Sequence, residues 1–168
     1  MRLLKLYKIE IVRKIQNPYA KTGRAEYQCF GCSPDNEIGL HLEFWDDGEY
    51  VIAKWMPRKL LEGYSNVLHG GIQATLLDEI ASWVVQTHCN TVGVTSSMEI
   101  TFRRAVLVSE GEITLRGRVK EAGTRMAIIE TELLVNDGKL CASAVVKYFL
   151  FSPEKASKEY FYPGADAF

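Results

Sequence analysis

The sequence NVLHGGIQATLLDEIASWVVQ, residues 66–86, is the most apolar long segment of the chain. On a helical wheel of about 100° per residue, its apolar side chains cover well over half of the circumference. Its polar side chains share one narrow stripe, made up of Thr75, Asp78, Glu79, Ser82 and Gln86. A helix on a protein surface normally has a broad polar face. The inverted pattern predicts a helix that is nearly enclosed, with a stripe that meets a cleft, a partner subunit or both.

The composition is that of an ordinary globular domain. The chain has 168 residues, of which 47% are hydrophobic and 24% charged, and its formal net charge is −1. This size fits one domain, and this charge gives no general attraction to nucleic acid or to an anionic membrane. No apolar run approaches the roughly 18 residues of a membrane span, and the N-terminus lacks the apolar core of a signal peptide. We therefore expect a cytoplasmic protein without nucleic-acid or membrane partners.

Residues 1–28 form a basic N-terminal extension, with seven Lys or Arg residues against two Glu. Its apolar residues recur at helical spacing: Leu4, Tyr7, Ile11 and Ile15. This spacing predicts a short amphipathic helix that ends before Asn17-Pro18. A docked helix with a solvated basic face is the favoured interpretation. A nucleic-acid-binding arm is the alternative, and nothing nearby adds support to it.

Alternation of apolar and polar residues predicts strands in the rest of the chain. Residues 40–44 indicate one strand, Asp46-Asp47-Gly48 a hairpin turn, and residues 50–56 the returning strand. Four further runs follow the helix, at residues 93–105, 110–120, 126–135 and 139–151. Together they predict an α+β fold in which an antiparallel sheet of about six strands wraps around the central helix. This domain spans residues 29–151, and residues 152–168 form a C-terminal tail. A free sheet edge is commonly covered by another subunit, so a homodimer is expected.

His69-Gly70-Gly71 stands where the chain enters the predicted helix. The first N–H groups of a helix lack intrahelical partners and lie at the positive end of its dipole. Glycine allows a substrate oxygen to approach this backbone closely, so the helix start is a candidate oxyanion site. A tight turn with close packing is the alternative. Asp78 lies eight residues beyond Gly70, or about 12 Å along the helix. Asp78 of an identical subunit, with its helix packed antiparallel, would come much closer.

Three blocks of the sequence resemble hotdog-fold acyl-CoA thioesterases, in particular the phenylacetate-pathway type. HGGIQATLLDE resembles the His-Gly-Gly to Asp motif of that family. CFGCSPDNEIGL and GVTSSMEITFRRAV look like the flanking loop and the strand after the helix. The resemblance covers residues 27–151, and it implies a hotdog fold and thioester hydrolysis at a dimer interface.

The resemblance also implies roles for individual residues. Gly70, with Gly71 beside it, matches the glycine whose N–H polarises the thioester carbonyl. Asp78 matches the carboxylate that activates water or attacks directly, contributed by the opposite subunit. His69 matches a positioning histidine, although a structural loop cap is an equal alternative. Thr95 falls where some members have a hydroxyl that holds the water. Asn66 corresponds to an amide that some members place before the histidine, at a different spacing.

Glu79 and Arg103 complete the candidate substrate-binding residues. Glu79 competes with Asp78, but it lies about 100° further round the helix, so both carboxylates cannot line one pocket wall. Arg103 could meet the phosphates of CoA, as could Arg104, Arg118 and Arg125. Solvated arginines on strand faces are the commoner case.

Cys29-x-x-Cys32 is interpreted as part of a loop that covers the site. Structural zinc needs four ligands, and no second Cys/His pair has suitable spacing. A redox pair is not supported either, since the sequence around it is not thioredoxin-like. The four cysteines do not form the pattern of a secreted disulfide scaffold at this chain length.

The sequence thus predicts an acyl-CoA thioesterase that needs no metal or redox cofactor and assembles as a homodimer or a dimer of dimers. A non-catalytic acyl-CoA-binding or sensing protein is the main alternative. A hydratase or dehydratase acting on enoyl thioesters is less favoured, because its usual His and carboxylate signature is missing. The acyl group, the choice between general-base and anhydride mechanisms, and the assembly beyond a dimer stay open.

Overall fold

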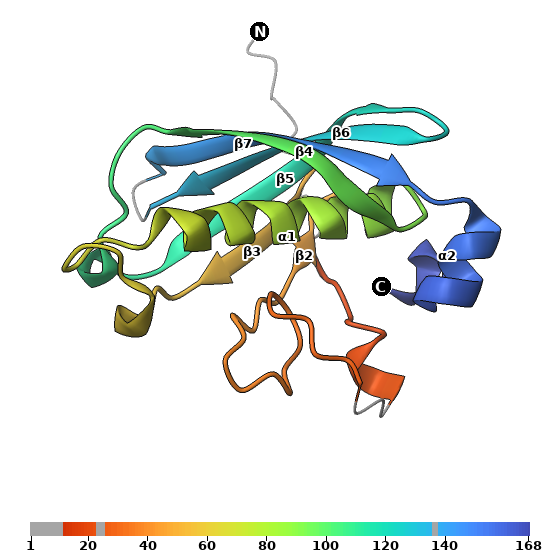
Figure 1. The fold of residues 1–168 in the computed structure, drawn as a ribbon, viewed down its shortest axis with the longest axis horizontal. Coiled ribbons are helices and arrows are strands. Elements are labelled where there is room, and N and C mark those ends of the chain that lie inside the picture. Colours follow the sequence, from red (N-terminus) through yellow and green to blue (C-terminus); the bar gives the residue numbers. More distant parts are fainter. Residues whose placement is uncertain (1–11, 23–25, 136–137) are drawn as a thin grey trace, which may run out of the picture.

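A computed structural model describes residues 12–22, 26–135 and 138–168. Its main feature is a seven-stranded antiparallel sheet with the strand order β1-β2-β3-β5-β6-β7-β4. The helix α1 (Gly70–His88) runs along one face of this sheet (Figure 1). The strands are β1 (Arg13–Lys14), β2 (Trp45–Asp46), β3 (Val51–Trp55), β4 (Gly93–Phe102), β5 (Ile113–Ala122), β6 (Met126–Leu134) and β7 (Leu140–Leu150). The predicted α+β architecture, with an antiparallel sheet around one central helix, is confirmed.

The four strand predictions after the helix are confirmed in order and in approximate extent, as β4 to β7. The hairpin turn is also confirmed. Gly48 has a φ of +93°, and the Asp47 carboxylate accepts hydrogen bonds from the N–H groups of Glu49 and Tyr50 at 2.9 and 2.6 Å. A carboxylate that bonds to backbone N–H groups two and three residues later is a typical turn former. None of the described helices is both long and apolar enough to span a membrane.

The N-terminal prediction is wrong where the structure describes it. Arg13 and Lys14 form strand β1, which pairs with β2, and the N–H of Ile15 donates to the carbonyl of Phe44. The helical spacing is misleading because buried Ile15 packs into the core from an extended segment. The rest of the predicted helix, residues 1–11, lies outside the described residues.

Residues 40–44 alternate in burial as predicted, but they are not a strand of the sheet. Leu40, Leu42 and Phe44 are buried. The N–H groups of Leu40 and Leu42 donate to the carbonyls of Phe30 and Gly31. The extended segment therefore pairs with the preceding loop, and only β2 joins the main sheet.

The sheet has one apolar and one charged face. The apolar face supplies the core under α1, from every long strand except β4: Val51, Ala53, Ile113, Leu115, Ile129, Leu133, Ala142, Ala144 and Val146 are among the buried residues. Small residues let the helix approach closely. At Gly117 a Cβ atom would lie 3.1 Å from Val84 of α1. The opposite face carries ion pairs such as Arg116–Glu132 and Lys120–Glu130.

The side of α1 that faces away from the sheet is covered by the two ends of the chain. The Trp83 ring stacks on Phe44 from the N-terminal part, with ring centroids 4.4 Å apart. Phe168, at the C-terminus, meets the same ring edge-on at 5.6 Å. The tail residues 152–168 contain the helix α2 (Pro153–Tyr160), and the Tyr162 hydroxyl donates to the Gln86 carbonyl at 2.5 Å. Loop and tail thus enclose the helix on the side that the sheet leaves open.

Gly93, at the start of β4, is a position where an added methyl group has no room. A Cβ atom there would lie 2.5 Å from the carbonyl oxygen of Phe149 on β7, a backbone atom that cannot rotate away. We expect Gly93→Ala to lower the free energy of unfolding by about 1–3 kcal/mol, measured by urea denaturation. Gly123→Ala is the matched control, because its Cβ would meet its nearest atom at an ordinary 3.6 Å. Equal stability of the two variants would contradict the prediction.

Candidate active site

Asp78 projects from the middle of α1 toward the β4–β7 pair, where two hydroxyl groups hold its carboxylate. The Thr95 Oγ1 hydroxyl donates to Oδ1 at 2.7 Å, and the Tyr148 Oη hydroxyl donates to the same oxygen at 3.0 Å. Thr95 and Tyr148 are register partners on the two strands. An irregularity of the pairing follows at once, between Thr95 and Ser97. Such bulges often re-aim side chains next to active sites.

The second carboxylate oxygen of Asp78 is open. Asp78 is half-buried, and no described residue donates a hydrogen bond to its Oδ2. Two hydroxyl donors on one oxygen fix the rotamer of the carboxylate and leave the other oxygen without a donor among the described residues. That oxygen can accept a proton from a water molecule or attack an electrophile directly.

Tyr148 is a site residue that the sequence interpretation missed. Burial, with the negative charge of Asp78 nearby, raises the pKa of Tyr148 far above its usual range. The phenol therefore stays protonated and keeps donating to Asp78. The available signal was a tyrosine at a core-facing position of a strand, because a buried phenol normally requires a hydrogen-bond partner.

His69 caps the N-terminus of α1. Its Nδ1 accepts a hydrogen bond from the N–H of Gly71 at 2.9 Å. In the neutral imidazole, the ring proton is therefore on Nε2. Its carbonyl accepts the N–H groups of Ile72 and Gln73. The cap alternative for His69 is therefore present in the structure. The predicted catalytic role of Gly71 is wrong, because its N–H already donates to His69.

Gly70 keeps the free donor. Its N–H has no acceptor among the described residues, and the residue is exposed at the positive end of the helix. A Cβ atom on Gly70 would meet only the Phe102 ring among the described residues, at an ordinary contact distance of 3.8 Å. This geometry suits the binding of a carbonyl oxygen that gains negative charge.

A groove of about 450 Å³ opens beside this N–H, and its lining includes His69, Gly70, Phe102, Arg103 and Arg104. The two arginines are exposed, as a group that meets a phosphate must be. Gln73 also lines the groove and is buried. Its Nε2 donates to the Leu68 carbonyl, and its Oε1 has no partner among the described residues. Arg103 therefore lines the groove beside the start of α1, and its contact with the phosphates of CoA stays a prediction.

Asn66 does not face this groove with a free amide. Its Nδ2 donates to the Ser109 hydroxyl at 2.9 Å, and its Oδ1 accepts from the Ser109 N–H at 2.9 Å. Asn66 also adopts a φ of +63°, which asparagine tolerates better than most residues. The predicted substrate contact is thus replaced by a loop-fixing role, because both polar atoms of the amide are already used.

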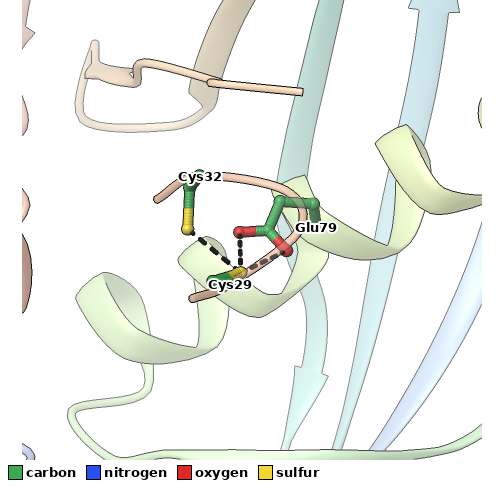
Figure 2. A group of neighbouring side chains, drawn as sticks. All are labelled: Cys29, Cys32 and Glu79. Atoms are coloured by element: carbon green, nitrogen blue, oxygen red, sulfur yellow. Dashed lines mark hydrogen bonds between the residues drawn. The ribbon is translucent and has the colours of Figure 1, made fainter. Parts of the chain in front are cut away.

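Glu79 points toward the Cys29–Cys32 loop (Figure 2). Its Oε1 accepts from the Trp83 indole N–H at 3.0 Å and lies 3.6 Å from the Cys29 sulfur. Burial raises the pKa of Glu79 to about 7. The predicted substrate-binding role of Glu79 is therefore wrong in this geometry, because the helical step of about 100° directs it to the other side of α1.

The loop and the tail border a second groove, of about 450 Å³, beyond Asp78. Ser82 and Gln86 of α1 line it together with Tyr19 and Tyr27 of the N-terminal part and Phe161 of the tail. Ser82 follows Asp78 by one helical turn. The two grooves thus flank the polar stripe of α1, one at the helix start and one beyond the aspartate.

Comparison with known proteins relates this chain to thioesterases. Residues 65–142 match the family model described as the thioesterase superfamily. A relative from Saccharolobus solfataricus, named provisionally as an esterase, is 27% identical over 117 residues, which cover 69% of this chain and 76% of that protein.

Two solved structures share the fold. The Escherichia coli PaaI protein from the phenylacetic acid degradation operon matches with a TM-score of 0.60 at 18% identity, over 67% of this chain and 81% of that chain. A hypothetical thioesterase from Streptococcus pneumoniae, solved with coenzyme A, matches with a TM-score of 0.58 at 21% identity, over 62% and 82% of the two chains.

The cap at His69 can be tested by its effect on stability. His69→Ala removes the acceptor for the Gly71 N–H, and we expect it to lower the free energy of unfolding by about 1 kcal/mol. His69→Asn restores a side-chain oxygen suited to the cap position and should recover most of that loss. Urea denaturation measures both. An alanine variant as stable as the wild type would show that the cap contributes nothing.

Proposed function

We propose that this hotdog-fold member of the thioesterase superfamily is an acyl-CoA thioesterase. In this proposal the protein is a dimer with two identical sites, and each site is shared between the two subunits. The reaction is the hydrolysis of a CoA thioester to a free acid and CoA. One observation carries the proposal: the open oxygen of Asp78 and the free N–H of Gly70 lie on one helix, eight residues apart. That spacing is about 12 Å, too far for both to act on one carbonyl group.

A second copy of the chain solves this problem. β4 is a terminal strand of the sheet, and Val94 and Phe102 on it are 47% and 52% exposed. A long free edge with exposed apolar side chains favours pairing with another chain. Pairing of two β4 edges about a two-fold axis brings the two α1 helices together antiparallel. Asp78 of one subunit then approaches Gly70 of the other.

In the proposed reaction, the thioester carbonyl oxygen accepts the Gly70 N–H at the positive end of α1. The Asp78 Oδ2 of the other subunit takes a proton from a water molecule, whose oxygen attacks the carbonyl carbon. The tetrahedral intermediate collapses, the carbon–sulfur bond breaks, and CoA leaves as a thiol with the proton from Asp78. Thr95 and Tyr148 hold the other oxygen of Asp78 throughout, so the base needs no reorientation. Direct attack by Oδ2, followed by hydrolysis of the anhydride, uses the same groups.

The groove at the helix start supports CoA as the leaving group. Arg103 and Arg104 line it beside Gly70, and guanidinium groups bind phosphates well. The pneumococcal protein with the same fold was solved with coenzyme A. We propose that the pantetheine arm lies along this groove, with the phosphates at the arginines.

The two halves of the site can be removed separately. Gly70 is the first residue of α1, a position that tolerates proline, and His69 has the extended backbone (φ −57°, ψ 134°) that a following proline requires. Gly70→Pro therefore deletes the N–H with little disturbance to the helix, and we expect kcat to fall by about 10²–10³-fold. Gly70→Ala keeps the N–H and should lose far less. Asp78→Asn removes the base and should abolish turnover.

A panel of acyl-CoA and aryl-CoA esters, with release of free thiol as the readout, measures all three variants. If the wild type bound these esters without releasing CoA, the protein would be a binding or sensing protein instead. Equal rates for Gly70→Pro and Gly70→Ala would remove the N–H from the mechanism.

Sharing between subunits has its own test. A mixed dimer of a Gly70→Pro subunit and an Asp78→Asn subunit contains one shared site with both defects and one with neither. We expect co-expressed, doubly tagged heterodimers to regain about half of the wild-type activity, while each homodimer stays inactive. If both residues of a site came from one chain, the heterodimer would stay as inactive as its parents.

A further inference from the structure

Cys29, Cys32 and Glu79 form a compact cluster on the side of α1 that faces the N-terminal loop (Figure 2). One ligand atom from each residue lies within 4.8 Å of the other two. The two sulfur atoms are 3.4 Å apart, and the Cys29 sulfur is 3.6 and 3.7 Å from the two oxygens of Glu79. The thioester chemistry proposed above uses none of the three side chains.

These separations match the edges of a tetrahedral zinc site. Zinc binds cysteine sulfur at about 2.3 Å and carboxylate oxygen at about 2.0–2.2 Å. A tetrahedron with such bonds has sulfur–sulfur edges of about 3.8 Å and sulfur–oxygen edges of about 3.5 Å. The spacings from the Cys29 sulfur therefore need changes of only a few tenths of an ångström, and the Cys32 sulfur lies within 4.8 Å of a Glu79 oxygen.

The backbone around Cys29 is shaped to hold this arrangement. The Cys32 thiol donates to the Cys29 sulfur at 3.4 Å, and the N–H groups of Cys32 and Gly31 also bond to that sulfur. A Cβ atom at Gly31 would lie 2.3 Å from the Glu79 carboxyl carbon, so a larger residue there would force the Glu79 side chain to shift. The carboxylate thus packs directly on the loop backbone, between the two cysteines and α1.

The cluster collects acidic groups without a basic partner. Glu79 contacts the Cys29 sulfur and the Trp83 indole N–H, and none of the described ion pairs includes Glu79. A carboxylate buried beside thiols requires a proton or a cation. The Trp83 N–H on Oε1 and the Tyr27 hydroxyl, 2.9 Å from the Cys32 sulfur, are the outer hydrogen bonds that metal ligands usually have.

We propose that Cys29, Cys32 and Glu79 bind one divalent zinc ion, which clamps the N-terminal loop to the central helix. Three protein ligands leave the fourth position to a water molecule, and both thiols lose their protons on binding. The clamp also positions Tyr27, which lines the groove beyond Asp78 with Ser82 and Gln86. The site forms whether or not the cleft hydrolyses thioesters.

The test uses the full-length protein, reduced and stripped of metal by a chelator that is then removed. Titration with Co²⁺ should give thiolate-to-cobalt charge-transfer absorption that saturates at one ion per chain, and Zn²⁺ should displace the cobalt. Zinc should also raise the melting temperature of the wild type in a concentration-dependent way. These readouts need no variant, so they stay informative if a substitution prevents folding.

Variants then identify the ligands. Cys29→Ser and Cys32→Ser should lose the charge-transfer absorption, and Glu79→Gln should weaken zinc binding by at least 10-fold. Cys89→Ser, at a half-buried cysteine outside the cluster, is the matched control and should bind like the wild type. Failure of the reduced, folded wild type to bind either ion would overturn the proposal. Unchanged metal binding by Cys29→Ser would also overturn the proposal. A protein that forms a Cys29–Cys32 disulfide and has no affinity for metal would do the same.

Discussion

The structure depends on the enclosure of α1. Nine of its nineteen residues are buried, on more than one side of the helix. The curved sheet covers one side, and Phe44 and Phe168 cover Trp83 on another. Apolar surface left in water would cost about 25 cal/mol per Å², so each uncovered side of such a helix needs its own covering element. The loop, the tail and, in the proposed dimer, the partner subunit are those elements. The polar residues of α1 lie at the boundaries between these covering elements.

Two neighbouring carboxylates of α1 show how different surroundings at these boundaries lead to different chemistry. Asp78 meets two hydroxyl donors, which orient its carboxylate. Glu79, one residue later, meets an indole N–H and two thiols, and burial raises its pKa to about 7. The helical step of about 100° is the only difference between their backbone positions. One carboxylate can therefore act as a base in a cleft, while the other belongs to a buried cluster that favours a cation.

Periodicity predicted the parts of the fold that depend on local pattern: the central helix, the four long strands and the Asp47–Gly48 turn. Spacing along the helix also singled out Gly70 and Asp78, whereas the resemblance to hotdog-fold thioesterases singled out Thr95. Local periodicity could not predict contacts between segments that are distant in the sequence. The pairing of β1 with β2, the bond of Tyr148 to Asp78 and the approach of Cys29 to Glu79 join residues 30 to 70 positions apart. Cysteine and histidine pairs show a local spacing in the sequence, whereas the Glu79 carboxylate comes from the central helix, 50 positions from Cys29.

In the proposed mechanism, the arrangement at the start of α1 leaves each chain with half of each shared site. His69 takes the N–H of Gly71 for its cap, which holds the loop and leaves the N–H of Gly70 directed outward. Reacting groups must come within about 3–3.5 Å of the substrate atoms, whereas Gly70 and Asp78 are about 12 Å apart on a helix packed too tightly to bend. Movement within one subunit therefore cannot bring them together. A two-fold related helix can, and its symmetry completes a second site at the same time. Under this proposal, assembly of the dimer and formation of the active site are one event.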